Sequence, residues 1–373
     1  MINRRILFLS DVNSAHTRKW AESLAKKGFK IGVFSLSPCT SDWFEGFPNI
    51  TVFSSVKLTP EQFIASDFSK VAYFKELRAL KEIIKVFKPD IVHAHYATSY
   101  GLLGVLTKFK PLIISLWGSD IFDFPRKSFL HKAVLKYNLK MADRILSTSY
   151  VMAEETKKYT DHPILVTPFG IDMELFKPQQ VKSLFDENDI VIGTVKVLDE
   201  VYGIDYLIKA FKLLKEKYPQ LPLKLLIVGR GQQTEDLKNL AIQLKIADDV
   251  VFTGFIDHAL VPAYHNMIHV SCFLSNSESF GVSVLEASSC EKPVVVTNVG
   301  GLPEVVDHSS TGFIVPPRYE AADPLAIEKL ILNSDLRKTL GKKGREKVSL
   351  LYDWNKNLEE IIQIYNDVLS NGS

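Results

Sequence analysis

Two glutamates eight positions apart are the first residues of this sequence that could act on a ligand. They bracket the stretch ESFGVSVLEA, in which Glu278 comes first, Gly281 lies between and Glu286 follows. In one continuous helix their carboxylates would lie about 80° apart around the axis and about two turns apart along it. One small ligand could hardly contact both. We therefore expect Glu278 in a loop and Glu286 in a helix that begins near Val282.

The start of this helix is predicted to bind an anion. Gly281 permits a tight turn and a close backbone approach, and the first N–H groups of a helix are free to donate to a ligand. Carboxylates accept hydrogen bonds from hydroxyl groups, whereas amides and cations favour phosphate, so this combination suits a sugar nucleotide. The simpler alternative is that Glu278 caps the helix and Glu286 lies on the surface.

Turns that could contact a ligand also follow the neighbouring strand-like segments. These turns contain Lys196, Gly229-Arg230-Gly231, Gly254 and Gly300-Gly301. Parallel α/β sheets bind ligands at the carboxyl ends of their strands, so this distribution favours a binding site over isolated surface turns.

The elements that carry these turns alternate between short apolar runs and helical patterns. Runs such as RILFLS, DIVHAHY, IVIGTV and LKLLIVG are apolar without alternation, as expected for parallel strands covered by helices on both faces. We expect an α/β fold of two Rossmann-like, doubly wound domains that face each other across a cleft. The predicted domains are 1–176 and 190–350, with a polar linker at 177–189 and a helix in 351–373 that packs back toward the first domain.

Composition and charge are those of a globular protein with an uneven charge distribution. The 373 residues are 46% hydrophobic and 24% charged, with a net charge of +2. Residues 1–170 contain 24 Lys and Arg against 15 Asp and Glu, and the remainder contains 21 against 28. The basic front half could meet a phosphate-bearing substrate or an anionic lipid surface, or its lysines could simply be solvated.

The cysteines and apolar runs lead us to expect a cytoplasmic protein. The three cysteines, Cys39, Cys272 and Cys290, have neither paired nor metal-like spacing, which favours a reducing compartment. Apolar residues 6–9 are too short for a signal-peptide core, and no run approaches the roughly 20 residues of a membrane-spanning helix.

ESFGVSVLEA resembles the E-x7-E motif of the retaining GT-B glycosyltransferases, in particular family 4 (glycosyl transferases group 1). The resemblance extends over nearly the full chain, and further similar segments are HAHYATSYGLL, GSDIF, TPFGIDMELFKP, PVVVTNVGGLPEVV and TGFIVPP. It implies that Glu286 binds the ribose hydroxyls, Glu278 binds the donor sugar and Lys196 pairs with the diphosphate.

The resemblance also implies the other donor contacts. Backbone amides would bind the sugar and diphosphate at Phe280, Gly281, Val282, Ser283 and Val284. The base would be bordered by two turns that include Arg230, Gly231, Phe255 and Ile256. The family usually has Arg near Lys196 and a second Lys where this chain has Tyr202, so Arg230, His258 or a front-domain residue could supply the missing charge.

The front domain is expected to contact the acceptor and the reacting sugar. The turn SDVNSAH and the strand-end segment WGSD supply the predicted acceptor-side residues Asn13, Ser14, His16, Arg18 and Trp117. The family often has His where Trp117 stands. His95 and Asp120 join Glu278 and Lys196 in the predicted catalytic set. His93 and His95 alternate on a strand without a third ligand, so we expect no metal site.

A basic segment of the front half suggests contact with a membrane. FPRKSFLHKAVLKYNLKMADRIL interleaves Arg126, Lys127, Lys132, Lys136 and Lys140 with Phe129, Val134, Tyr137 and Met141. A helix with this face could rest on anionic lipid at the inner side of the cell membrane. Alternatively, it is an ordinary amphipathic helix that covers the sheet.

These features predict a retaining, metal-independent hexosyltransferase without a cofactor. Its donor would be a nucleotide diphosphate sugar, favoured to be a UDP-sugar, and its acceptor a glycan linked to polyprenyl diphosphate. The reaction would belong to polysaccharide, lipopolysaccharide or other glycoconjugate assembly, and no nucleic acid is expected as a partner. The alternatives are a small soluble acceptor, a sugar-nucleotide epimerase of the same architecture, and a non-catalytic nucleotide-sugar sensor.

Overall fold

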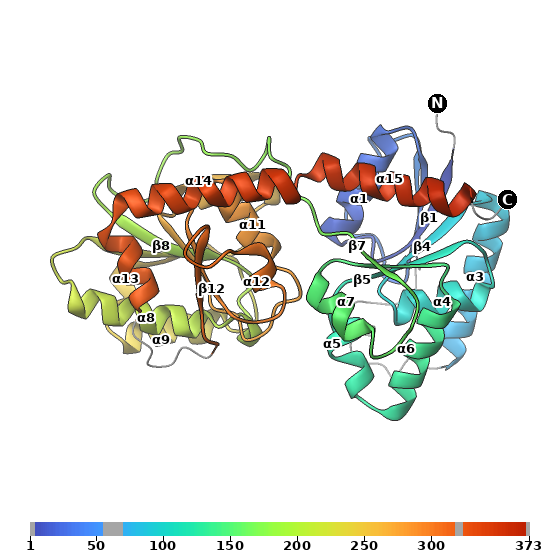
Figure 1. Cartoon of the computed structure of the whole chain (residues 1–373), viewed down its shortest axis with the longest axis horizontal. Helices are drawn as coiled ribbons and strands as arrows, with labels where there is room; N and C mark the ends of the chain where they lie inside the picture. The colour runs from blue at the N-terminus through green and yellow to red at the C-terminus, as the bar shows by residue number, and fades with distance from the viewer. Residues whose placement is uncertain (1–3, 55–69, 318–323, 371–373) are drawn as a thin grey trace. The chain divides into compact units, whose positions relative to one another are not determined.

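The structure is a computed structural model that describes residues 4–54, 70–317 and 324–370. The chain forms two compact units, which are coloured by residue number in Figure 1. Unit 1 comprises Met1–Thr167 and Leu358–Ser373, and unit 2 comprises Pro168–Asn357.

Unit 1 is built on a seven-stranded parallel sheet. Its strands are β1 (Arg5–Leu9), β2 (Lys30–Ser35), β3 (Ile50–Ser54), β4 (Ile91–His95), β5 (Leu112–Leu116), β6 (Arg144–Ser147) and β7 (Ile164–Val166). They lie in the order β3-β2-β1-β4-β5-β6-β7. The chain reverses its direction of progress across the sheet between β1 and β4. This pair is the switch point at which doubly wound sheets bind ligands.

Helices connect these strands. They are α1 (Ala15–Lys26), α3 (Lys70–Phe87), α4 (Ser99–Thr107), α5 (Ser119–Phe122), η1 (Phe124–Arg126), α6 (Phe129–Met141), α7 (Tyr150–Thr156) and the terminal α15 (Trp354–Ser370). Helix α1 illustrates the amphipathic pattern of these helices, because it buries Trp20, Ala21 and Leu24 on one face. It is followed by Gly28, whose φ of 92° suits a glycine.

Unit 2 repeats this topology with six parallel strands. They are β8 (Ile190–Val195), β9 (Leu223–Val228), β10 (Val250–Phe252), β11 (Val270–Phe273), β12 (Val294–Thr297) and β13 (Gly312–Val315). Their order is β10-β9-β8-β11-β12-β13, so the switch point lies between β8 and β11.

The helical segments of unit 2 lie between and after these strands. They are η2 (Glu200–Tyr202), α8 (Ile204–Lys217), α9 (Thr234–Gln243), η3 (Ala247–Asp249), η4 (His258–Leu260), α10 (Val261–Met267), α11 (Val282–Ser289), α12 (Leu302–Val305), α13 (Leu325–Leu332) and α14 (Ser334–Leu351). The expected α/β fold of two doubly wound domains is thus confirmed.

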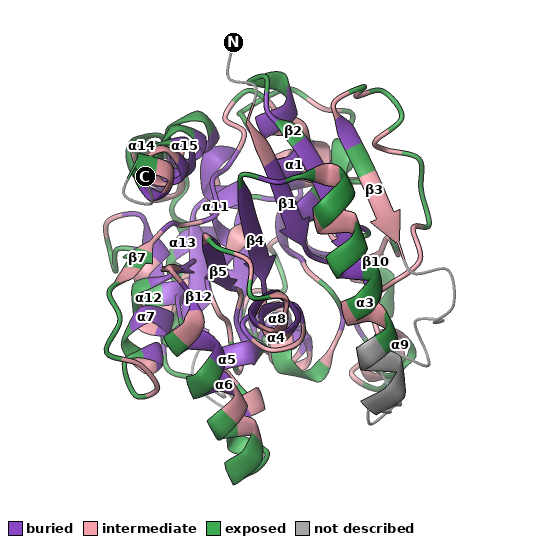
Figure 2. Cartoon of the chain, turned by 90° about the vertical axis from the view of Figure 1, so that its right-hand side faces the viewer, coloured by how far each residue is buried: buried purple, intermediate pink, exposed green. Residues whose placement is uncertain are grey.

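The apolar runs form the centre of each sheet because helices cover both faces. Every residue of β4 and β5 is buried, and Figure 2 shows these two strands and β1 in the colour of buried residues. The sequence analysis did not identify β3 and β13, which lie at sheet edges. In β3 the last three residues are half-buried, so the strand lacks the continuous apolar run of its neighbours.

The division between the units differs from the expected one. It falls after Thr167 rather than after residue 176. The reason is that Phe169, Ile171 and Phe176 are buried in unit 2, where the amide of Ile171 donates to the carbonyl of Tyr352 at 2.7 Å. Helix α15 begins in unit 2 and continues into unit 1, where the Tyr365 hydroxyl lies 2.8 Å from Nδ1 of His93.

Candidate active site

A lysine and a glutamate meet at the switch point of unit 2. Lys196 follows β8 and Glu278 follows β11, the two strands between which the sheet order reverses. Lys196 Nζ donates to Glu278 Oε2 at 2.5 Å, and their side chains are only 13% and 11% exposed. The predicted diphosphate cation and the predicted sugar-binding carboxylate therefore lie together, at the edge where such sheets bind ligands.

Tyr202, where the resemblance would place a second lysine, contacts Lys196. The ammonium of Lys196 lies 4.3 Å from the centroid of the Tyr202 ring. Burial raises the pKa of Tyr202, so its hydroxyl stays neutral at physiological pH. In place of a second cation, the ring face of Tyr202 attracts the ammonium group of Lys196. This contact between Tyr202 and Lys196 was not predicted from the sequence.

The predicted glycine turn at Gly300-Gly301 holds the Glu278 loop in place. The amide of Gly301 donates to the carbonyl of Glu278 at 3.1 Å. Gly300 has a φ of +49°, and a Cβ there would lie 1.6 Å from that carbonyl oxygen. Only glycine permits this approach, so the turn fixes the backbone of Glu278.

The loop after β11 leads into α11, as the spacing of the two glutamates predicted. Gly281 precedes the helix with a φ of 108°, and α11 begins at Val282. The amide of Val284 donates to the Gly281 carbonyl at 3.1 Å. This amide is already used within the first turn of the helix, whereas the roles predicted for the amides of Phe280, Gly281, Val282 and Ser283 stay predictions.

Glu286 lies on α11 with its carboxylate between two histidines. Its Oε1 is 3.7 Å from His258 Nε2, and its Oε2 is 3.6 Å from His265 Nε2. Burial alone would raise the pKa of Glu286, but the two nearby histidines outweigh it and lower the pKa to about 2. Glu286 is therefore ionised and able to accept from hydroxyl groups.

His265 was not identified from the sequence. It is fully buried in α10, and its ring packs against Phe176 with centroids 6.1 Å apart. No local spacing connects it with Glu286, since the two meet only through the packing of α10 against α11.

The turns predicted to border the base lie together. Gly229 and Gly254 form a β-bridge, which joins the turns after β9 and β10. The guanidinium carbon of Arg230 lies 4.8 Å from the centroid of Phe255, whose side chain is 67% exposed. An exposed aromatic ring beside a cation could stack on a nucleotide base. Gly231 and Ile256 flank this pair in sequence, and their predicted roles stay predictions.

In unit 1 three of the predicted residues form an aromatic cluster at the switch point, in which His95 is buried and His16 and Trp117 are half-buried. His95 ends β4, and its ring stacks on Trp117 with centroids 4.6 Å apart. His16 contacts the same indole at 5.8 Å, and Nδ1 of His95 lies 3.0 Å from the hydroxyl of Ser10. Burial lowers the pKa of His95 well below its usual value, with smaller effects of His93 and His16. His95 is therefore neutral at physiological pH.

Asp120, predicted to be catalytic, makes three backbone contacts. Its carboxylate accepts from the amides of Ala97 at 2.8 Å, Trp117 at 3.2 Å and Gly118 at 2.8 Å. Burial raises the pKa of Asp120, and these hydrogen bonds oppose that effect. Asp120 thus connects the turns after β4 and β5. Its catalytic role stays a prediction.

The remaining acceptor-side candidates lie on the turn and helix after β1. The side-chain oxygen of Asn13 accepts from the hydroxyl of Thr40 at 2.8 Å, and Ser14 precedes α1 as its cap residue. Arg18 pairs with Glu22 at 2.7 Å one turn along α1 and is 55% exposed. Asn13 therefore ties two loops together, and the predicted acceptor contacts of all three residues stay predictions.

The ring nitrogens of His93 are not available to bind a metal ion. Both ring nitrogens of His93 have protein partners, Tyr365 at 2.8 Å and Ser115 at 2.7 Å. Among the residues that the structure describes, no three His, Cys, Asp or Glu side chains gather in a way that could hold a metal ion.

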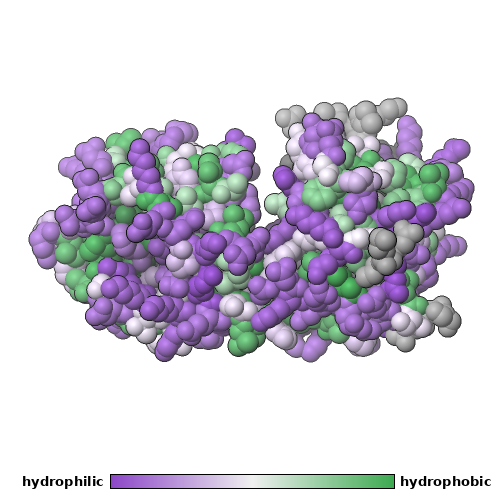
Figure 3. All heavy atoms as spheres, turned by 90° about the horizontal axis from the view of Figure 1, so that it is seen from above, coloured by the Kyte–Doolittle hydropathy of each residue, from purple (hydrophilic) through white to green (hydrophobic). Residues whose placement is uncertain are grey.

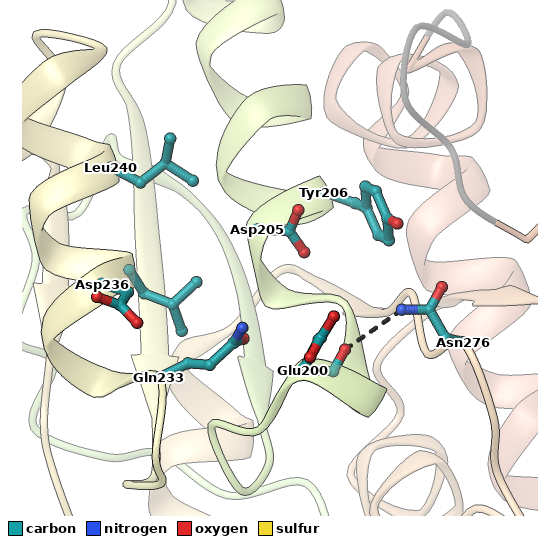
Figure 4. Close-up of a pocket in the computed structure, with 8 residues that line it drawn as sticks. Glu200, Asp205, Tyr206, Gln233, Asp236, Leu240 and Asn276 are labelled. Carbon is teal, nitrogen blue, oxygen red and sulfur yellow. Dashed lines mark hydrogen bonds between the residues drawn. The ribbon is translucent and has the colours of Figure 1, made fainter.

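A pocket of unit 2 lies between η2, α8 and α9 (Figure 4). Its lining residues are Glu200, Asp205, Tyr206, Gln233, Asp236, Leu237, Leu240 and Asn276. Three carboxylates line it, and they would repel a diphosphate. We therefore do not assign the donor to this pocket.

Two family models match the chain. The model described as "Glycosyl transferases group 1" matches residues 176–347, and "Glycosyl transferase 4-like" matches residues 5–149.

Individual relatives cover most of the chain. It is 26% identical to N-acetyl-alpha-D-glucosaminyl L-malate synthase of Bacillus anthracis, over 75% of this chain and 75% of that protein. It is 29% identical to the capsular polysaccharide biosynthesis glycosyltransferase CapM of Staphylococcus aureus, over 80% of this chain and 83% of that protein.

A solved structure shows the same fold. Anabaena Alr3699/HepE in complex with UDP-glucose superposes with a TM-score of 0.74 and 19% identity, over 97% of this chain and 99% of that chain. Since the two family models together match most of both units, the chain belongs to the glycosyl transferases group 1 and is a GT-B glycosyltransferase.

Proposed function

We propose that this glycosyltransferase moves a hexosyl unit from a UDP-sugar to a glycan acceptor, with retention at the anomeric carbon. The Lys196–Glu278 pair at the β8/β11 switch point carries the proposal, because it joins a cation for the diphosphate to an acceptor for sugar hydroxyls. Glu286, ionised between His258 and His265, would accept from the ribose hydroxyls.

Catalysis would be electrostatic. When the donor binds, the ammonium of Lys196 would turn to the diphosphate, and Glu278 would exchange its lysine partner for hydroxyl groups of the sugar. The first amides of α11 and Lys196 would stabilise the charge that develops on the leaving diphosphate. That diphosphate would take the proton of the attacking acceptor hydroxyl on the same face of the sugar, so neither glutamate acts as acid or base.

Similarities to named relatives support the substrate classes. HepE was solved with UDP-glucose, which favours a UDP-hexose, and CapM is named for capsular polysaccharide biosynthesis. We therefore favour a lipid-linked glycan acceptor in cell-surface polysaccharide or lipopolysaccharide assembly, met at the cytoplasmic side of the membrane. The name of the Bacillus anthracis relative, N-acetyl-alpha-D-glucosaminyl L-malate synthase, supports the second candidate, a small soluble acceptor.

A panel of UDP- and GDP-sugars incubated with the protein tests these proposals. We expect release of UDP from one UDP-hexose, and transfer when a polyprenyl-diphosphate-linked glycan is added. Retention is read from the anomeric configuration of the product by NMR, and metal independence from activity in a chelator. Interconversion of donors would instead identify an epimerase, binding without turnover a sensor, and transfer to small hydroxy acids the second candidate. Glu278→Ala is the control for contaminating activity.

A further inference from the structure

The beginning of α6 exposes large apolar side chains to solvent. Phe129 is 87% exposed, Leu130 69% and Tyr137 48%. Figure 2 shows α6 extending from the rest of unit 1 with exposed residues along its outer part. By contrast, the face of the molecule in Figure 3 shows mostly hydrophilic residues with small hydrophobic areas scattered among them. Neighbouring exposed apolar residues on a helix are typical of an interaction site.

The exposed side of α6 carries an apolar stripe and a basic stripe, which overlap at Phe129. With about 100° per residue, Phe129, Leu130 and Tyr137 fall within about 100° of one another around the axis. Lys132, Lys136 and Lys140 are exposed and spread over about 80° of a sector that overlaps the apolar one at Phe129.

The opposite side of α6 is anchored in unit 1. Leu135, Asn138 and Leu139 are buried, and the side-chain amide of Asn138 donates to the carbonyl of Ala97 at 2.8 Å. This anchoring fixes which side faces solvent. It also corrects part of the expected apolar face, since Val134 and Met141 are half-buried and Leu130 takes their place.

The charge around the apolar stripe has one sign. Residues 124–142 contain five cations and no Asp or Glu, the cations being Arg126, Lys127, Lys132, Lys136 and Lys140. Arg126 approaches Glu155 at 3.5 Å but is 65% exposed, and within the described ranges no ion pair engages the four lysines. A partner that covers this surface must therefore be both anionic and able to accept apolar side chains.

We propose that α6 binds an anionic lipid surface, with Phe129, Leu130 and Tyr137 entering the headgroup region and the lysines contacting lipid phosphates. A bilayer interface accepts apolar side chains and attracts cations without requiring a matching shape. No helix within the described residues is both long and apolar enough to cross a membrane, so this contact is peripheral. The inference deepens the proposed function and rests on it in one respect, since a lipid-linked acceptor must be met at a membrane.

Flotation of the full chain with vesicles tests this surface. We expect binding to vesicles of phosphatidylcholine with phosphatidylglycerol, weak binding to phosphatidylcholine alone, and release at high salt. F129S/L130S should weaken the binding by about tenfold or more, and K132Q/K136Q/K140Q should weaken it comparably and remove the salt dependence.

The matched control is a second pair of neighbouring exposed leucines. Leu350 and Leu351 at the end of α14 are 67% and 52% exposed, and L350S/L351S should leave vesicle binding unchanged. The proposal is overturned if the wild-type chain does not float, if neutral vesicles bind equally well, or if the control pair has the same effect. A dimer in solution that F129S/L130S dissociates would overturn it in favour of an interface between two copies.

Donor hydrolysis without vesicles separates this inference from the proposed function. All three variants should hydrolyse the donor at the wild-type rate, because α6 is not part of the candidate donor site. Vesicle binding without any donor hydrolysis would count against the proposed function alone, and hydrolysis without vesicle binding would count against the lipid surface alone.

Discussion

The two sheets share one strand order but place different chemistry at their switch points. In unit 1, Ser10 and His95 are buried and hydrogen-bonded to each other, and His95 is neutral. In unit 2 the corresponding edge holds the ion pair of Lys196 and Glu278. An ion pair removed from water adds little to stability, because desolvation offsets the attraction of the charges. We therefore expect the unit 1 edge to contribute mainly to stability, and we propose that the unit 2 edge binds a charged ligand.

The largest expected effect comes from Glu278. Glu278→Ala should lower the rate of transfer by about 10²–10³-fold or more, because the sugar loses its acceptor and Lys196 loses the group that holds it. Nucleotide affinity should change little, since Glu286 and the base-bordering turns remain. Steady-state rates and UDP titration calorimetry measure the two effects, and wild-type turnover would disprove the assignment.

Asp120 in unit 1 provides the matched comparison. Asp120→Asn replaces a carboxylate that accepts from three backbone amides, so it should reduce the free energy of unfolding by about 2–3 kcal/mol. Thermal and denaturant unfolding check this. The comparison variant is Glu278→Gln, which keeps an amide oxygen as a partner for the buried Lys196 ammonium and should unfold nearly as the wild type does. If Asp120→Asn instead abolished transfer with stability intact, the predicted catalytic role of Asp120 would stand and the contrast between the edges would fail.

The next prediction separates the two glutamates of unit 2. Glu286→Ala should weaken UDP binding by about 10–100-fold, as expected when hydrogen bonds between a charged group and the ribose are lost. The rate at saturating donor should fall much less than in Glu278→Ala. Titration of both variants with UDP and with UDP-sugar measures the difference in affinity. If both variants lost affinity and rate equally, the separate roles assigned to Glu278 and Glu286 would be wrong.

The fold could be predicted because its information is local. Each β–α repeat is visible in the sequence as an apolar run followed by a helical pattern. The edge strand β3 was missed because its last three residues are only half-buried, and β13 was missed although three of its four residues are buried. The order of the strands in each sheet depends on contacts between residues far apart in the sequence, which local patterns do not reveal. Lys196 and Glu278 lie 82 residues apart, and they meet because β11 pairs with β8.

The candidate site shows where prediction from residue types ends. A carboxylate at a strand end suggested catalysis for both Glu278 and Asp120, yet the partners of Asp120 are backbone amides that sequence patterns do not reveal. Tyr202 could be recognised as a departure from the family, but its contact with Lys196 depends on the conformation of η2.

Tyr202 offers a third, smaller test of the unit 2 edge. Its ring attracts the Lys196 ammonium at 4.3 Å, a contact worth about 0.5–2 kcal/mol. Tyr202→Leu should therefore reduce the rate of transfer by up to about thirtyfold, whereas Tyr202→Phe retains the ring and should stay within about twofold of the wild type. Steady-state rates of the two variants measure this difference. If both variants lost the same amount of activity, the hydroxyl group of Tyr202, and not its ring, would be the group that matters.

The last prediction concerns stability rather than rate, through the neutral histidines of unit 1. Burial lowers the pKa of His93 to about 3, against a usual value near 6.5 in the unfolded chain. As the pH falls below about 6.5, the unfolded chain takes up this proton first. The stabilisation is therefore complete above that pH and is lost as the pH falls toward 3, by at most about 1.4 kcal/mol per pH unit and histidine.

Removing one titrating group should reduce this slope. His93→Gln lowers the overall stability but should flatten its dependence on pH between about 6.5 and 4.5, as measured by denaturant unfolding at several pH values. In unit 2, His269, whose pKa burial lowers to about 4, contributes in the same direction, so the result is read from the change in slope. His162 in unit 1 is exposed, and His162→Gln should leave the slope as it is. If the pH dependence of stability were unchanged in His93→Gln, folding would not be what keeps the His93 imidazole neutral.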